Sequence, residues 1–104
     1  MKKILLACNA GMSTSLLVSR MEKTAKEQGI EVMITAVGVT EVESIFKDWD
    51  VILLGPQVRH QLKFLEKKVN GIIPIQVIDM RDYGLMNGEK VLATALKVIA
   101  EFQK

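Results

Sequence analysis

The residues most able to do chemistry lie together near the N-terminus, where Cys8, the only cysteine, ends an apolar run. The segment after it reads Asn9, Ala10, Gly11, Met12, Ser13, Thr14 and Ser15, and a helical pattern then begins. A helix starting here would place backbone N–H groups and its positive dipole end beside the thiol, where they bind anions and favour the thiolate. The segment therefore predicts a nucleophile, Cys8, next to a phosphoryl-binding loop formed by residues 9–15.

The alternative for Cys8 is an ordinary buried cysteine, which is what most lone cysteines are. Its place at the end of the apolar run, and the small residues after it that let backbone approach a ligand, favour chemistry instead. The helix start also carries hydroxyls but no acid, since Leu16 stands where a capping carboxylate would. A later helix differs, because Thr40 with Glu43 predicts a capping box. We expect the first helix start to be open to an external anion, with at least one hydroxyl acting as an ordinary N-cap.

Two catalytic groups of a cysteine-dependent phosphatase have no clear counterpart here. Such an enzyme has Cys-x5-Arg, in which the arginine clamps the phosphoryl oxygens, whereas Thr14 stands six positions after Cys8. A hydrolase also needs an acid for the leaving group, and Asp79 is the only candidate from a neighbouring loop, with a plain turn role at least as favoured. The site therefore favours a carrier of the phosphoryl group, and a small phosphatase or arsenate-reductase-like enzyme is the first alternative.

Two further alternatives share the same fold class. A flavodoxin-like phosphate-binding module could hold an FMN phosphate on the hydroxyls, but none of the five aromatic residues stands where a flavin ring would stack. A response-regulator receiver would need an aspartate at the end of the third strand, where Leu54 and Gly55 stand.

Composition predicts one small domain over residues 1–104, because half of the 104 residues are apolar and can form a core. A net charge of +2 with dispersed lysines argues against a nucleic-acid partner. One cysteine excludes an internal disulfide and suggests a reducing compartment. The apolar run ending at Cys8 is too short for a signal peptide or a membrane span. We therefore expect a cytoplasmic protein.

Hydrophobic periodicity predicts four strands alternating with helices. Strands are expected at 3–8, 31–37, 51–54 and 74–78, helices at 13–28, 40–49 and 58–69, a loop at 79–88, and a final helix after it. Such alternation gives an α/β three-layer sandwich with a four-stranded parallel sheet, for which we expect the order 2-1-3-4 and helices on both faces. Cys8 then lies at the switch point, with the loop Gly55-Pro56-Gln57 beside it.

The chain closely resembles the enzyme IIB component of the bacterial sugar phosphotransferase system (PTS), lactose/cellobiose/N,N'-diacetylchitobiose class. Residues 8–15 are similar to that family's phosphorylation loop, residues 51–57 to its third strand and following turn, and Val77-Ile78-Asp79 with Tyr83-Gly84 to its last strand and loop. The resemblance covers essentially the whole chain. It implies a phosphatase-like P-loop fold and no cofactor or metal.

The resemblance also implies a mechanism and partners. A cytoplasmic IIA protein would carry phosphohistidine, Cys8 would accept the phosphoryl group as phosphocysteine, and a membrane IIC permease would present the sugar that receives it. Residues 9–15 would hold the phosphoryl oxygens, and which hydroxyl of Ser13, Thr14 or Ser15 helps is left open. The protein would lie at the inner face of the membrane when docked on IIC.

Four more side chains have an ordinary role as the favoured interpretation. His60 could pair with the thiol, but a thiolate favoured by a helix needs no base. Arg59 and Arg81 could meet an acidic IIA surface, although solvated charges are commoner. Tyr83 could shape the rim of the site or pack over the sheet edge.

Overall fold

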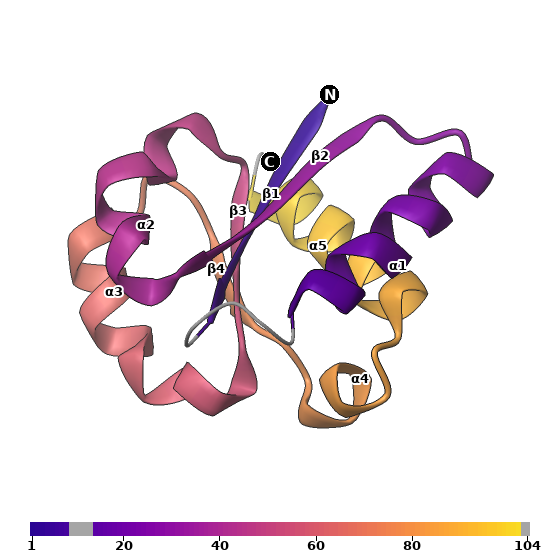
Figure 1. The fold of residues 1–104 in the computed structure, drawn as a ribbon. Helices are drawn as coiled ribbons and strands as arrows, with labels where there is room; N and C mark the ends of the chain where they lie inside the picture. The colour runs from indigo at the N-terminus through magenta and orange to yellow at the C-terminus, as the bar shows by residue number, and fades with distance from the viewer. Residues whose placement is uncertain (9–13, 103–104) are drawn as a thin grey trace.

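The computed structural model describes residues 1–8 and 14–102, which form a parallel sheet between helices (Figure 1). In chain order the elements are β1 (Lys2–Cys8), α1 (Thr14–Glu27), β2 (Val32–Gly38), α2 (Val39–Ile45), the 3₁₀ helix η1 (Phe46–Asp48), β3 (Val51–Leu54), the 3₁₀ helix η2 (Pro56–Gln61), α3 (Leu62–Val69), β4 (Ile75–Val77), α4 (Met80–Gly84) and α5 (Gly88–Phe102).

The four strands form one parallel sheet in the order β2-β1-β3-β4, which confirms the predicted topology. Every residue of β3 is buried, and so are residues 4–8 of β1. These are the two most apolar strands, and a central parallel strand is covered by helices on both faces. Burial therefore places the end of β1, and with it Cys8, in the middle of the sheet's carboxyl edge.

Helices cover both faces, so the molecule has the three layers predicted (Figure 1). On one face, Leu17, Met21 and Ala25 of α1 pack with the buried side of α5 against the sheet. On the other face, Val42 of α2 and Leu65 of α3 pack against alternate residues of the same strands. The helices that follow β1 and β3 thus lie on opposite faces, which makes the expected switch point between those two strands.

The start of α5 lies against the backbone of α1. A Cβ at Gly88 would come within 2.6 Å of the Arg20 carbonyl carbon, so only glycine permits this approach. From α1, the Arg20 guanidinium donates to the carbonyls of Leu85 and Met86, at 3.3 and 3.1 Å. These contacts fix α1 relative to the loop before α5, and so fix the helix whose first residue is Thr14.

Three local predictions are wrong. The segment 79–88 is not only a loop, because it contains α4, whose first N–H groups are bound by the Asp79 carboxylate. The capping box predicted from Thr40 and Glu43 is displaced, because Gly38 takes the extended N-cap conformation and the helix begins at Val39. The third helix starts with η2, since Pro56 at its first turn is followed by the non-helical backbone of Val58.

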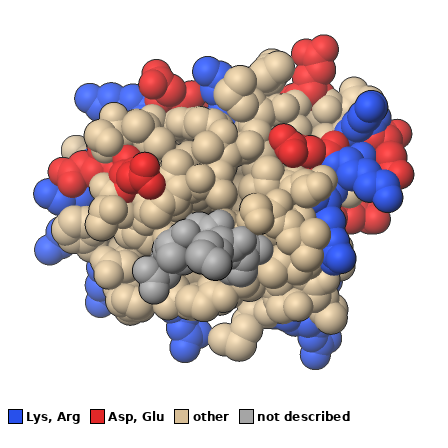
Figure 2. Space-filling model, in the orientation of Figure 1, with Lys and Arg blue, Asp and Glu red and all other residues tan. Residues whose placement is uncertain are grey.

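The face nearest the viewer in Figure 1 is the β2 edge of the sheet, and Figure 2 shows that lysines and arginines lie mainly along its rim. The middle of this face is mostly uncharged, in agreement with the absence of charged residues from Val32 to Gly38. In residues 1–8 and 14–102, no helix is both long enough and apolar enough to cross a membrane.

Candidate phosphoryl-binding site

The sheet register places Cys8 between two segments that end neighbouring strands. Cys8 pairs with Gly38 at the end of β2, and Ala7 pairs with Leu54 at the end of β3. The pairing continues past β3, because the Gly55 N–H donates to the Ala7 carbonyl at 2.8 Å. The thiol therefore lies at the carboxyl edge, next to Gly38 on one side and Gly55 on the other.

Thr14, the first residue of α1, contacts the thiol directly. Its Oγ1 lies 3.3 Å from Cys8 Sγ, a hydrogen bond in which either group could be the donor. Cys8 is 2% exposed and Thr14 1%, so water competes little for this bond. A thiolate can only accept, so in that state the Thr14 hydroxyl donates to sulfur. The position that holds arginine in the Cys-x5-Arg pattern here holds a neutral donor to the nucleophile.

The start of α1 adds favourable electrostatics without an internal counter-charge. The first turn of α1 contains no acidic residue, and the helix runs for 14 residues. The dipole of such a helix is positive at this end, where a negative charge is stabilised. Its neutral first turn, beside the thiol, suits a negatively charged ligand.

The remaining loop residues lie outside the described part of the chain. These are Asn9, Ala10, Gly11, Met12 and Ser13, and their predicted phosphate contacts stay predictions. The sequence did not decide which hydroxyl helps to bind the phosphoryl group. Thr14 is buried and its hydroxyl contacts the thiol, whereas Ser15, the next residue of α1, is exposed.

A hollow of about 550 Å³ opens beside Cys8 at the carboxyl edge. It is lined by Cys8, Gly38, Val39, Thr40, Gln57, Val58, His60, Gln61 and Phe64. These residues come from the last residues of β1 and β2 and from the segments that follow β2 and β3. Among the described residues that line it there is no lysine, arginine, aspartate or glutamate.

Gly55 allows this crowding next to the thiol. An added Cβ would lie 3.3 Å from Cys8 Cβ and 3.2 Å from Gln57 Oε1, both tight contacts. Its backbone is ordinary extended backbone, with φ −61° and ψ 144°. The glycine is needed here for space, because β3 and η2 approach the end of β1 closely.

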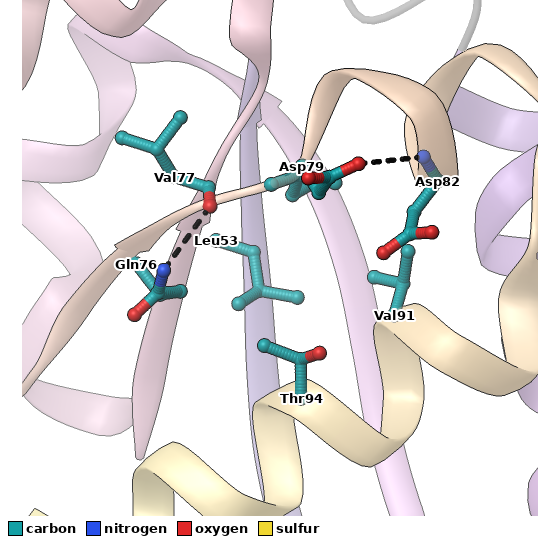
Figure 3. Close-up of a pocket in the computed structure, with 8 residues that line it drawn as sticks. Leu53, Gln76, Val77, Asp79, Asp82, Val91 and Thr94 are labelled. Carbon is teal, nitrogen blue, oxygen red and sulfur yellow. Dashed lines mark hydrogen bonds between the residues drawn. The ribbon is translucent and has the colours of Figure 1, made fainter.

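Asp79, the candidate acid of the phosphatase alternative, caps a helix. Its Oδ1 accepts from the Arg81 N–H at 2.9 Å and from the Asp82 N–H at 3.2 Å. Asp79 also lines a separate cavity of about 180 Å³ between β4 and α5, which Val91 and Thr94 of α5 border (Figure 3). Asp79 is therefore the N-cap of α4 and not the plain turn residue considered from the sequence, and its carboxylate does not line the hollow beside Cys8.

The other side chains singled out from the sequence separate into two groups. His60 does line the hollow beside Cys8. Arg59 is exposed on η2 and Arg81 on α4, and neither lines that hollow. Tyr83 is 5% exposed within the hydrophobic core, which confirms packing over the sheet as its role.

Gln57 and Thr40 both line the hollow, although their residue types and sequence positions predicted no role in the site. Their positions could have been inferred from the predicted parallel topology, because residues directly after neighbouring strands meet at one edge of the sheet. Among the described residues, no group of three or more histidine, cysteine, aspartate or glutamate side chains is placed to hold a metal ion.

The fold and site define a class of protein. It is a parallel α/β protein with a cysteine at the switch point, and this cysteine forms a hydrogen bond with the first residue of the next helix. The sequence profile of the family described as "PTS system, Lactose/Cellobiose specific IIB subunit" matches residues 3–94. The chain belongs to this family.

Individual relatives agree with that assignment. The galactose-specific EIIB component of Lactococcus lactis subsp. cremoris (strain MG1363) is 46% identical over 100 residues, covering 90% of this chain and 93% of the relative. The oligo-beta-mannoside-specific EIIB component of Bacillus subtilis (strain 168) is 42% identical over 100 residues, covering 95% and 97%. The solution structure of a cellobiose-specific IIB component from Borrelia burgdorferi superposes with a TM-score of 0.82 at 46% identity, covering 96% and 93%.

Proposed function

We propose that Cys8 carries the phosphoryl group between two partners of a sugar phosphotransferase system. It accepts the group from a phosphohistidine of a cytoplasmic IIA protein and passes it to a sugar presented by a membrane IIC permease. The observation that carries this proposal is the buried Cys8–Thr14 bond at the acid-free start of α1. Membership of the IIB family supports it.

In the first transfer, the Cys8 thiolate attacks phosphorus in line. The S–P bond forms while the N–P bond to the histidine breaks, so the imidazole is the leaving group. In the second transfer, a sugar hydroxyl oxygen attacks the same phosphorus, the S–P bond breaks, and the hydroxyl proton is released. The thiolate is regenerated and can again accept the Thr14 hydrogen bond.

The geometry favours transfer over hydrolysis. Thr14 replaces the arginine that would clamp a hydrolytic transition state, and the Asp79 carboxylate is held by the backbone of α4. Stabilisation restricted to a transition state is what accelerates a reaction, so losing both groups slows attack by water. Residues 9–15 hold the phosphoryl oxygens in this proposal, through backbone N–H groups and hydroxyls.

The wider setting is part of the same proposal. Residues 1–104 act as one cytoplasmic domain that meets the membrane only by docking on IIC, and the acceptor is a disaccharide being imported. The relatives are named for galactose, cellobiose and oligo-beta-mannosides, and these names support a sugar as the acceptor. The permease would select among them.

Mass spectrometry after incubation with phosphorylated IIA tests the proposal. We expect one added phosphoryl group, mapped to Cys8 and prevented by prior alkylation of the thiol. Cys8→Ser should accept no stable phosphoryl group, while a normal circular dichroism spectrum shows that it is folded. A stable phosphoryl group on this variant, or on another residue of the native chain, would overturn the proposal.

A further inference from the structure

We infer that Gln57 contacts the phosphoryl group on Cys8 with its side-chain amide, as a donor from outside the loop of residues 9–15. The inference rests on the proposed function and adds a residue to that site. Three observations carry it: Gln57 and Cys8 both lie close to Gly55, a turn with buried flanking residues presents Gln57, and the described residues lining the hollow include no lysine or arginine.

Gln57 and Cys8 both have atoms close to Gly55. A Cβ added at Gly55 would lie 3.2 Å from Gln57 Oε1 and 3.3 Å from Cys8 Cβ. Gln57 and Cys8 therefore both border the space beside Gly55, and both line the same hollow. Rotation of the terminal amide exchanges its oxygen and NH₂ group, so the donor can face a ligand on sulfur.

The second observation is the turn that holds Gln57 in place. Pro56 and Val58 are both buried, whereas Gln57 between them is exposed to the hollow. The Pro56 ring fixes its backbone φ, and the Val58 N–H donates to the Gly55 carbonyl at 3.0 Å. No hydrogen bond links the Gln57 amide to a described residue. The turn is anchored on both sides, and its side-chain donor is available.

The third observation concerns charge. A phosphocysteine is an anion, and the described residues that line the hollow include neither lysine nor arginine. A primary amide supplies N–H donors without adding charge, so it can follow the phosphoryl group through transfer without trapping it. Gln76 has the same side chain but lies on β4, where it lines the separate cavity and not the hollow beside Cys8, which makes it the matched control.

A kinetic comparison tests the inference. Gln57→Met keeps the side-chain length but removes the amide, and single-turnover phosphorylation by phosphorylated IIA should slow by about tenfold, as for loss of one hydrogen bond to a charged group. Gln57→Glu should slow it further, because a carboxylate repels the incoming group. Gln76→Met, a change outside the hollow, should react at the native rate. A native rate for Gln57→Met would overturn the inference, whereas failure of the native chain to be phosphorylated would overturn the proposed function.

A spectroscopic test separates contact from a structural effect. In a ¹⁵N-labelled native chain, the side-chain NH₂ resonances of Gln57, assigned by their loss in Gln57→Met, should move downfield on phosphorylation. Those of Gln61 and Gln76 should stay in place. Unmoved Gln57 resonances in the phosphorylated protein would overturn the inference.

Discussion

The helices α1, α2 and α4 each follow a strand at the carboxyl edge of the sheet. They differ in whether a carboxylate of the chain accepts hydrogen bonds from the N–H groups at the helix start. At α2, Glu41 Oε2 accepts from the Gly38 N–H at 2.9 Å. At α4, Asp79 Oδ1 accepts from two N–H groups. The first turn of α1 has no acidic residue, and its first side chain bonds the thiol instead.

This difference gives a physical reason for placing the proposed phosphoryl site at the start of α1. A helix start attracts negative charge whether the charge belongs to the chain or to a ligand. Where a carboxylate of the chain already accepts those N–H groups, as at α2 and α4, an external anion meets both competition and repulsion. The start of α1 lacks that competitor and adjoins the only cysteine of the chain. The comparison therefore supports residues 8–15 as the phosphoryl site.

The largest effect is expected from Thr14→Val, which keeps the shape of Thr14 but removes its hydroxyl. A hydrogen bond to a charged partner is worth about 1.5–3 kcal/mol, so phosphorylation of Cys8 should slow by about tenfold to a hundredfold. Iodoacetamide alkylation of the thiol should slow in parallel. Thr14→Ser retains the hydroxyl and should recover most of both rates. Equal rates for valine and threonine would show that the bond does not serve the thiolate.

A smaller effect should follow from giving α1 the acid that α2 and α4 possess. Leu16 is 49% exposed in the first turn, so Leu16→Glu adds a carboxylate without disturbing the core. The carboxylate should raise thermal stability by about 0.3–1 kcal/mol through the helix dipole. It should also slow phosphoryl acceptance by about threefold to tenfold, because two negative charges near one helix start repel.

Leu16→Gln is the matched control for this variant, since it has the same shape without charge. It should transfer phosphoryl groups at nearly the native rate. Raising the salt concentration should narrow the gap between the glutamate and glutamine variants, because screening weakens the repulsion. A salt-independent gap would point to a steric cause.

Asp79→Ala makes the opposite change at α4, where it removes the carboxylate that caps the helix. Loss of such an N-cap costs about 1 kcal/mol, so the midpoint of urea unfolding should fall. Phosphorylation of Cys8 should continue at close to the native rate, because Asp79 does not line the hollow beside the thiol. A large loss of transfer with normal stability would restore Asp79 as a catalytic acid.

The strand order was predictable because burial and alternation carry it. Strands that lie at the centre of a parallel sheet are apolar throughout, and residues 4–8 and 51–54 are. The five-residue α4 was not predictable from periodicity, which needs more than one turn to show. Its Asp79 cap resembled an ordinary turn residue, and only the backbone N–H groups of Arg81 and Asp82 distinguish the two.

The site was predictable in part. Cys8 and its loop are consecutive in sequence, so their types and spacing indicated the chemistry. The predicted strand order also placed the loop Gly55-Pro56-Gln57 beside Cys8, whereas Thr40 reaches the hollow through the register of Cys8 with Gly38, which the sequence did not indicate. The hydrogen bond between Cys8 and Thr14 could not be predicted from the sequence, because a hydroxyl at a helix start more often caps its own helix.

The smallest effect is expected at α2, where Glu41 binds only one N–H group. Glu41 is exposed, so Glu41→Ala should cost a few tenths of a kcal/mol to about 1 kcal/mol, and Glu41→Gln less. Its position past Gly38, which pairs with Cys8, adds a second consequence. Removing this negative charge near the hollow should raise the rate of phosphoryl acceptance slightly, by less than about threefold, most clearly at low salt. A fall in that rate would mean that Glu41 assists phosphoryl acceptance. It would contradict the view that a carboxylate at the start of α2 only caps the helix and repels an external anion.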